Sequence, residues 1–291
     1  MRRLKFFVVG GIIFALVLGA VAQDNSANEA KKLYNSGLAA LRQGNIAVAI
    51  QDLNKSVQKD PSIAVAYYAL GLAYKKNGDL GKAEKSYQTA ISKDPKYAKT
   101  YIALGLLQTS IQKYADAINT YRAAINTHPN LAKAYWGLGY VYLRQKNYRK
   151  AAENFKKAVN SDSTYAKAWE NLGVSYMQLS RFSDAKIALL KAIKYQKRNS
   201  RKANAYLRLG DTLLKLKDLS GAQAAYTKAI RYTRSSTIRA AANFGMGEVF
   251  KTRGRKQQAI AYYQKASRNR AWRQSALYEI DMIKNGKRYV R

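Results

Sequence analysis

Residues 64–97 read AVAYYALGLAYKKNGDLGKAEKSYQTAISKDPKY, and residues 98–131 read AKTYIALGLLQTSIQKYADAINTYRAAINTHPNL. In both segments an aromatic residue stands three positions before a Leu-Gly pair, and an alanine follows the glycine by twelve positions. Apolar residues three and four positions apart lie on one face of a helix, so each segment predicts two amphipathic helices. The glycine recurs at a spacing of 34 and finally of 37 residues, at Gly37, Gly71, Gly105, Gly139, Gly173, Gly210 and Gly247.

This pattern resembles the tetratricopeptide repeat (TPR), whose 34-residue unit carries W-x2-L-G-x2-Y, then A-x3-F, then P. The resemblance covers residues 30 to 273. It implies an all-α fold, a right-handed α-solenoid of about seven helix pairs with a C-terminal capping helix, because one helix pair cannot bury its apolar face alone. The expected units lie near residues 30–63, 64–97, 98–131, 132–165, 166–202, 203–239 and 240–273.

The segments that flank the array have their own expected roles. Residues 23–29 are polar and predict a linker, and residues 274–291 predict a capping helix with a basic tail. Ala276, Leu277, Ile280 and Ile283 form the apolar stripe of that helix, and Gly286 is suited to end it. The junctions at residues 197–202 and 234–239 each hold three extra residues, which predict either a longer helix or a wider turn.

The first 22 residues have the layout of a secretory signal peptide. Arg2, Arg3 and Lys5 form a basic head, residues 6–21 are apolar or glycine, and Ala20-Val21-Ala22 provides a small-x-small cleavage site. We therefore expect an exported, periplasmic protein of the bacterial envelope. Two alternatives stay open: an uncleaved inner-membrane anchor at residues 6–22, or an extracellular location.

The composition argues against catalysis. There is no cysteine, which excludes disulfides and thiolate chemistry, and His128 is the single histidine. The acids are scattered at turns and helix ends, where they suit capping. We therefore predict a protein that is not an enzyme, with no cofactor and no metal.

The TPR resemblance also implies a concave groove lined by the first helix of each pair, and it places positions 2, 5, 9, 12 and 13 of each unit there. In the N-terminal half positions 2, 5 and 9 are mostly aromatic, apolar or lysine, which predicts a groove for a peptide or helix that is amphipathic or acidic. Further along, the same positions carry Glu170, Asp211 and Glu248. The alternative interpretation is that these side chains only pack within the superhelix. The predicted groove residues are Lys31, Tyr34, Tyr68, Lys99, Ile102, Lys133, Trp136, Tyr140 and Lys167.

The formal net charge of +35 predicts acidic partners. Our first hypothesis is a scaffold or adaptor that binds protein partners in the groove. The alternative is a charge-driven binder of an anionic envelope surface such as peptidoglycan or lipopolysaccharide. Nucleic acid would also be an acidic partner, but an exported chain seldom encounters it. Whether the protein self-associates stays open. The predicted basic surface comprises Lys197, Arg198, Arg201, Lys202, Arg234, Arg239, Arg253 and Arg255.

Overall fold

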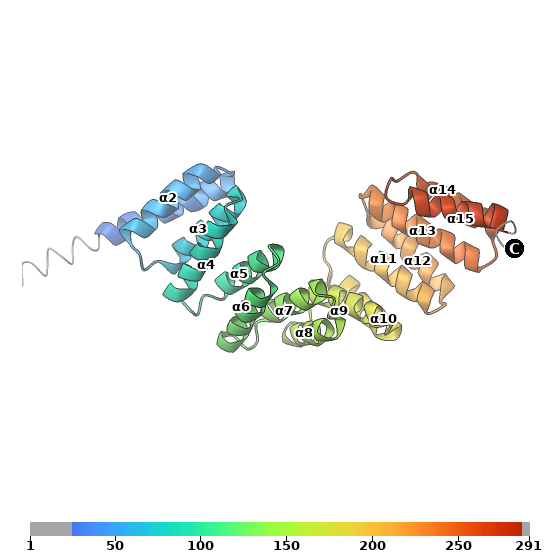
Figure 1. Cartoon of the computed structure of the whole chain (residues 1–291), viewed down its shortest axis with the longest axis horizontal. Coiled ribbons are helices and arrows are strands. Elements are labelled where there is room, and N and C mark those ends of the chain that lie inside the picture. Colours follow the sequence, from blue (N-terminus) through green and yellow to red (C-terminus); the bar gives the residue numbers. More distant parts are fainter. Residues whose placement is uncertain (1–24, 287–291) are drawn as a thin grey trace, which may run out of the picture. The chain divides into compact units, whose positions relative to one another are not determined.

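The computed structural model describes residues 25–286, so the predicted signal segment, residues 23–24 of the linker and residues 287–291 of the tail lie outside the described part. Every regular element in residues 25–286 is a helix (Figure 1). The chain divides at Pro129 into two compact units, and each is treated by itself. In the described range no helix combines the length and apolarity needed to cross a membrane.

The first unit consists of consecutive helices that pack against their neighbours along the chain. Residues 25–43 are helical. The helices that follow are α2 (Ile46–Lys59), α3 (Ala64–Asn77), α4 (Leu80–Lys93), α5 (Ala98–Ser110) and α6 (Tyr114–Thr127).

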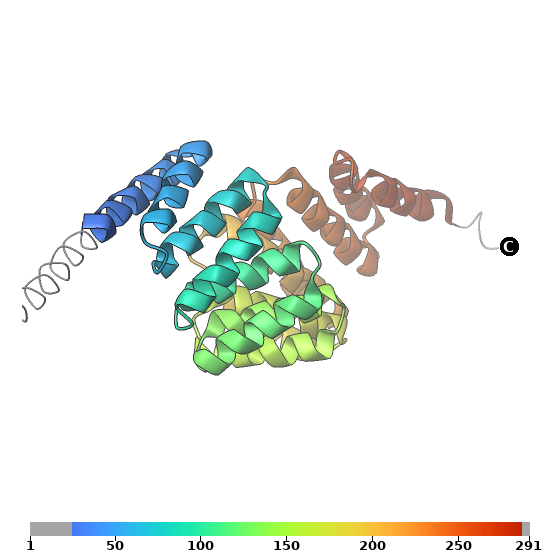
Figure 2. The same ribbon diagram turned by 60° about the vertical axis from the view of Figure 1, so that its left-hand side comes forward.

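In the second unit the first helix of each pair (α7, α9, α11 and α13) alternates along the chain with a second helix (α8, α10, α12 and α14), and Figure 2 shows the chain turned from the view of Figure 1. Here α7 contacts α9, α9 contacts α11, and α11 contacts α13, so the first helices of successive pairs form one layer. We call the face formed by these first helices the inner surface of the second unit, and the face formed by the helix at residues 25–43, α3 and α5 the inner surface of the first unit. The helices are α7 (Ala132–Arg144), α8 (Tyr148–Ser161), α9 (Ala166–Gln178), α10 (Phe182–Tyr195), α11 (Asn199–Lys215), α12 (Leu219–Tyr232), α13 (Ser236–Thr252), α14 (Lys256–Ser267) and α15 (Arg273–Asn285).

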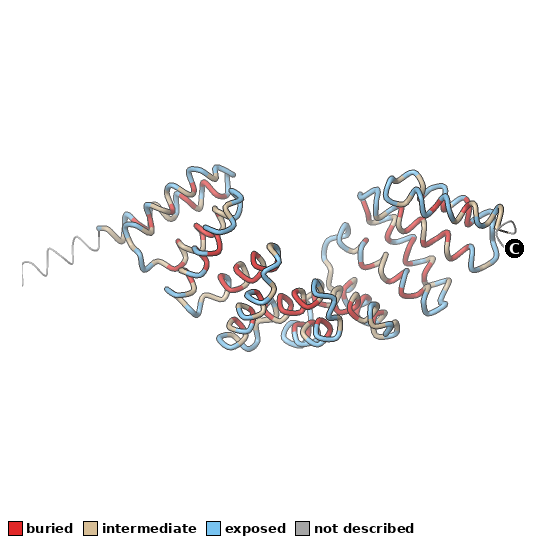
Figure 3. Tube along the Cα trace, viewed as in Figure 1, coloured by how far each residue is buried: buried red, intermediate tan, exposed pale blue. Residues whose placement is uncertain are grey.

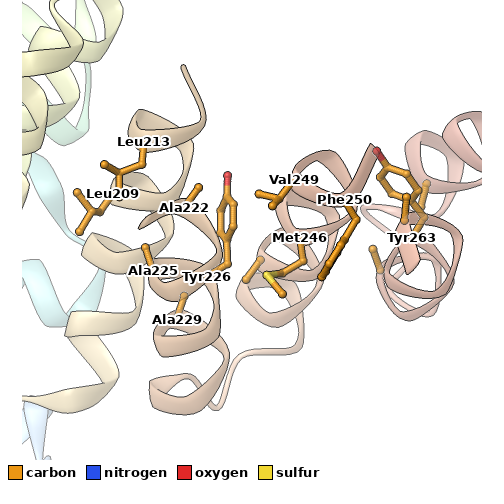
Figure 4. Packing of buried hydrophobic residues seen from close by; sticks show 14 of the residues in the cluster. Leu209, Leu213, Ala222, Ala225, Tyr226, Ala229, Met246, Val249, Phe250 and Tyr263 are labelled. Carbon is orange, nitrogen blue, oxygen red and sulfur yellow. The ribbon is translucent and has the colours of Figure 1, made fainter. Parts of the chain in front are cut away.

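The repeated glycine lets the two helices of a pair come into close contact. A Cβ atom added to Gly71 would lie 2.5 Å from the ring of Tyr87, and one added to Gly210 would lie 2.5 Å from the ring of Tyr226. Both tyrosines are fully buried. The constant spacing between the glycine of the first helix and the bulky residue of the second helix therefore reflects one packing contact that recurs in each helix pair. Buried residues accordingly recur along the facing sides of the helices (Figure 3), and Figure 4 shows Tyr226 packed among the core side chains of the second unit.

The two irregular junctions lengthen the helix that follows each of them. Helices α11 and α13 have 17 residues, whereas the other first helices from α3 to α9 have 13 or 14. Three residues add about one helical turn. The first of the two interpretations of the extra residues, a longer helix, is thus the correct one.

The capping helix α15 buries a narrower stripe than the sequence predicts. Ala276 and Ile280 are buried against the array and Ile283 is partly buried, but Leu277 is 52% exposed. The prediction for Leu277 was wrong, because α14 covers only one side of this last helix. Gly286 also keeps a right-handed conformation, with φ of −53°, and does not form a left-handed cap.

Candidate functional site

The inner surface of the first unit presents a cluster of aromatic rings. The ring of Tyr68 on α3 lies edge-on to that of Tyr97, with centroids 5.2 Å apart, and 5.9 Å from that of Tyr87. Burial raises the pKa of the Tyr68 phenol, and the nearby Tyr34 adds to the shift. Tyr34 and Tyr68 are only partly buried. Tyr34 and Tyr68 therefore pack against core side chains and still have a surface that a partner could contact, whereas Tyr87 is fully buried.

An apolar pocket of 540 Å³ lies on the same inner helices. Leu38, Leu41 and Leu72 form its apolar lining, and three basic side chains complete its wall, those of Arg42, Lys75 and Lys76. The Lys76 ammonium donates a hydrogen bond to the Leu41 carbonyl oxygen at 3.1 Å, which links the two inner helices. The pocket suits an apolar side chain that has an acidic neighbour.

The remaining predicted groove residues of this unit lie on the helix at residues 25–43 and on α5. Lys31 and Lys99 are exposed, and Ile102 is partly buried. Neither lysine forms an ion pair with a carboxylate of the described residues. They add positive charge to the first helices of this unit.

In the second unit the predicted anchor Trp136 is buried instead of presented to solvent. Only 4% of the Trp136 surface is exposed. Tyr140 stacks on the indole at 5.4 Å and an interplanar angle of 14°, and the Lys167 ammonium lies 4.0 Å from the ring centroid. The Tyr165 ring lies 6.2 Å from the Trp136 ring between centroids, and burial raises the pKa of its phenol to about 12. The accessible parts of this group are thus Tyr140 and Lys167, together with the exposed Lys133.

Further along the second unit the inner surface is acidic. The Tyr226 hydroxyl donates to Asp211 Oδ1 at 2.8 Å, and the Tyr263 hydroxyl donates to Glu248 in the same way. In both pairs the tyrosine extends through the core from the second helix to position 9 of the first helix. These carboxylates were visible in the sequence at groove positions, but the predicted site did not include them.

A third carboxylate, that of Glu170, lies on the neighbouring inner helix. Its Oε1 atom is 3.6 Å from the Arg208 guanidinium. Burial raises the pKa of Glu170, although Arg208 and Lys167 oppose the shift. The inner surface of the second unit therefore combines acids and bases, whereas the first unit combines aromatic and basic groups.

Family comparisons identify the repeat. Models of the tetratricopeptide repeat match residues 96–163 and residues 34–98, 147–201, 170–236 and 207–276, which together span most of the chain. The chain is a TPR protein. No sequence among the curated proteins matches it.

Solved structures of other TPR proteins share the fold. The C-terminal part of a TPR repeat-containing protein from Cytophaga hutchinsonii is 18% identical, with a TM-score of 0.67, over 85% of this chain and 99% of that one. A TPR protein from Parabacteroides merdae is 17% identical, with a TM-score of 0.60, over 89% and 100%. YrrB, described as a TPR protein with an unusual peptide-binding site, is 22% identical, with a TM-score of 0.58, over 67% and 97%. At such identities the similarity shows the fold alone.

The predicted basic surface of this TPR protein is spread over two junctions and one turn. Six of its side chains are exposed, while Lys202 and Arg253 are partly buried. Arg253 donates to Gln223 at 2.5 Å and to Ser220 at 3.2 Å, so it helps to join neighbouring repeats. None of the eight forms an ion pair within the described part of the chain.

The described residues offer no group of three or more His, Cys, Asp or Glu side chains that could hold a metal ion. His128 lies at the end of α6, and its Nδ1 atom is 2.8 Å from the Thr127 hydroxyl oxygen. This contact is local to the repeat junction.

Proposed function

We propose that this TPR protein is a non-catalytic scaffold or adaptor that binds segments of partner proteins on the inner surfaces of its two units. The observation that carries the proposal is the inner surface of the first unit. Tyr34 and Tyr68 stand there one helical turn before Leu38 and Leu72, which line an apolar pocket with basic walls. Aromatic side chains that are already ordered lose little entropy on binding, so they make effective anchors for a peptide or helix.

The two inner surfaces would select different partner segments. The pocket of the first unit presents Arg42, Lys75 and Lys76, which fit a segment with apolar and acidic residues. On the second unit Asp211 and Glu248 fit a segment that carries lysine or arginine. One partner that carries both kinds of segment, or two different partners, could occupy the two inner surfaces.

We also propose that the protein works in the bacterial cell envelope. The support is the signal-like sequence of residues 1–22. N-terminal sequencing of protein from the envelope fraction tests this directly. A mature chain that begins at Gln23 is expected; the full-length chain in the membrane fraction would indicate an anchor, and recovery in the cytoplasm would refute export.

Affinity capture from the native envelope tests the scaffold function. The tagged full chain is compared with a Tyr68→Ala variant and with Val48→Ala, a control at a 47% exposed position of the second helix α2. We expect a discrete protein that survives a high-salt wash, that is lost with Tyr68→Ala and that is kept with Val48→Ala. Recovery of wall or lipid material alone, released by salt, would instead support the charge-driven alternative.

A further inference from the structure

The last repeat contains a pocket that lies apart from the inner surfaces. It has a volume of 730 Å³ and lies among α12, α13, α14 and the segment that follows α14. Asn243 contributes to its wall, and we call it the Asn243 pocket. Ile230, Met246 and Tyr262 provide apolar lining on the other sides.

This pocket exists because the last repeat departs from the repeat pattern. Five earlier units carry an aromatic residue three positions before the repeated leucine, and in the preceding unit this is Tyr206. Tyr206 stacks on Tyr232 with ring centroids 5.6 Å apart. In the last unit, 37 positions further on, both residues are replaced by asparagine, Asn243 and Asn269. Two large rings are thus exchanged for two small amides.

The Asn243 side chain is buried and has no protein partner. Only 8% of the residue is exposed, and its carboxamide makes no hydrogen bond to another residue within 25–286. Its carboxamide lines the pocket, so a ligand there could accept hydrogen bonds from its N–H groups.

The charged groups around the pocket are all positive. Arg239, Lys265, Arg268 and Arg270 line it, and no carboxylate does. In the described part of the chain none of these four side chains forms an ion pair. Arg239 lies on the turn that the extra residues add to α13, so the lengthened helix brings one of the four charges to the pocket.

We propose that the Asn243 pocket binds the phosphate group of an organic phosphate. Guanidinium, ammonium, amide and hydroxyl groups supply hydrogen-bond donors, and hydrogen bonds from ionised donors to phosphate are strong. The apolar wall formed by Ile230, Met246 and Tyr262 receives the non-polar part of the ligand. The ligand is a soluble phosphate ester or the headgroup of a phospholipid. This site is separate from the inner surfaces and does not depend on the scaffold function.

The preceding repeat provides matched controls. Asn243→Tyr restores the aromatic residue of the pattern and places a ring in the pocket without changing the net charge. Arg239→Gln with Lys265→Gln removes two charges from the pocket. Lys202→Gln with Lys228→Gln removes the two equivalent charges one repeat earlier, where Tyr206 occupies the space and the Lys228 ammonium lies 5.4 Å from its ring centroid.

Binding is measured by isothermal titration calorimetry with glycerol 3-phosphate, and by sedimentation with phosphatidylcholine vesicles that contain phosphatidic acid. The full chain should bind at least one probe saturably. Asn243→Tyr and the Arg239/Lys265 variant should each weaken that binding about tenfold or more, the loss expected for one or two charge-assisted hydrogen bonds. The Lys202/Lys228 control should bind the same probe with an affinity within about twofold of that of the unaltered chain.

The two probes separate the sources of the phosphate. Binding of glycerol 3-phosphate alone indicates a soluble ester, and vesicle binding that both pocket variants abolish indicates a lipid headgroup. Binding of neither probe overturns the proposal. Equal weakening in the control overturns it as well, because simple net charge would then explain the result. Circular dichroism checks folding; if Asn243→Tyr does not fold, the Arg239/Lys265 variant still decides the outcome.

Discussion

Two tyrosines at the same position of their repeats should respond in opposite directions to loss of the hydroxyl group. Tyr87 and Tyr226 are both fully buried. The Tyr226 hydroxyl donates to Asp211 at 2.8 Å. The Tyr87 hydroxyl has no hydrogen-bond partner among residues 25–286, and Leu72 occupies the position that corresponds to Asp211.

The magnitudes follow from these environments. A buried hydroxyl without a partner costs about 1–3 kcal/mol, so Tyr87→Phe should raise the free energy of unfolding by about 1 kcal/mol. A hydrogen bond to a carboxylate contributes about 1.5–3 kcal/mol. Asp211 is exposed, so water can partly replace the lost donor. We therefore expect Tyr226→Phe to lower the free energy of unfolding by about 1–2 kcal/mol.

Urea unfolding followed by far-ultraviolet circular dichroism measures both changes. The midpoint should rise for Tyr87→Phe and fall for Tyr226→Phe, while the dependence on urea concentration stays the same. A double-mutant cycle of Tyr226→Phe with Asp211→Leu isolates the hydrogen bond and should give a coupling energy above about 0.5 kcal/mol. Midpoints that shift in the same direction for both tyrosine variants would refute the reasoning.

Burial raises the pKa of Glu84, but hydrogen bonds, chiefly from Lys113 at 2.7 Å, outweigh it and leave the pKa below its ordinary value of 4.5. The folded state thus binds this proton less tightly than the unfolded chain, so the stabilisation is present above pH 4.5 and is lost as the pH falls below that value. Glu84→Gln should lower the free energy of unfolding by about 1–2 kcal/mol at neutral pH and by progressively less in acid, measured by urea unfolding across pH; a constant difference would contradict this. Gly210→Ala should destabilise the fold by about 1–3 kcal/mol and so lower the thermal midpoint, because the added Cβ atom would meet a buried ring. Gly81→Ala should leave the midpoint unchanged or raise it, because no atom lies within 4 Å of a Cβ atom added there. Lys217→Gly should raise the free energy of unfolding by about 0.5–1 kcal/mol, measured in urea, because Lys217 has a φ of 61°.

The repeat pattern made the helix pairs predictable for a physical reason. Gly71 must be glycine because the ring of Tyr87 occupies the space of a Cβ atom, so the packing contact leaves a trace in the sequence. The same reasoning applied to the last repeat could have located the Asn243 pocket, since the missing aromatic is visible at position 243. The longer α13 that borders it was one of two interpretations left open by the spacing.

Exposure was harder to predict than helix position. Trp136 stands at a groove position, but whether its ring faces solvent depends on how Tyr140 and Lys167 cover it, and the spacing of residues does not record that. The link between Asp211 and Tyr226 is different, because it could have been found in the sequence. In two repeats an acid at position 9 coincides with a tyrosine 15 residues later, and Glu248 with Tyr263 is the second case.

Site-specific photo-cross-linking tests the central claim, that partner proteins bind the inner surfaces. A benzophenone amino acid replaces Tyr68 or Tyr140 on these surfaces, and Ile187, which is 58% exposed on the second helix α10, serves as the control. After irradiation of cells, the account predicts a discrete protein adduct from at least one inner position and none from Ile187. The same adduct from Ile187, or no protein adduct from either inner position, would contradict the account.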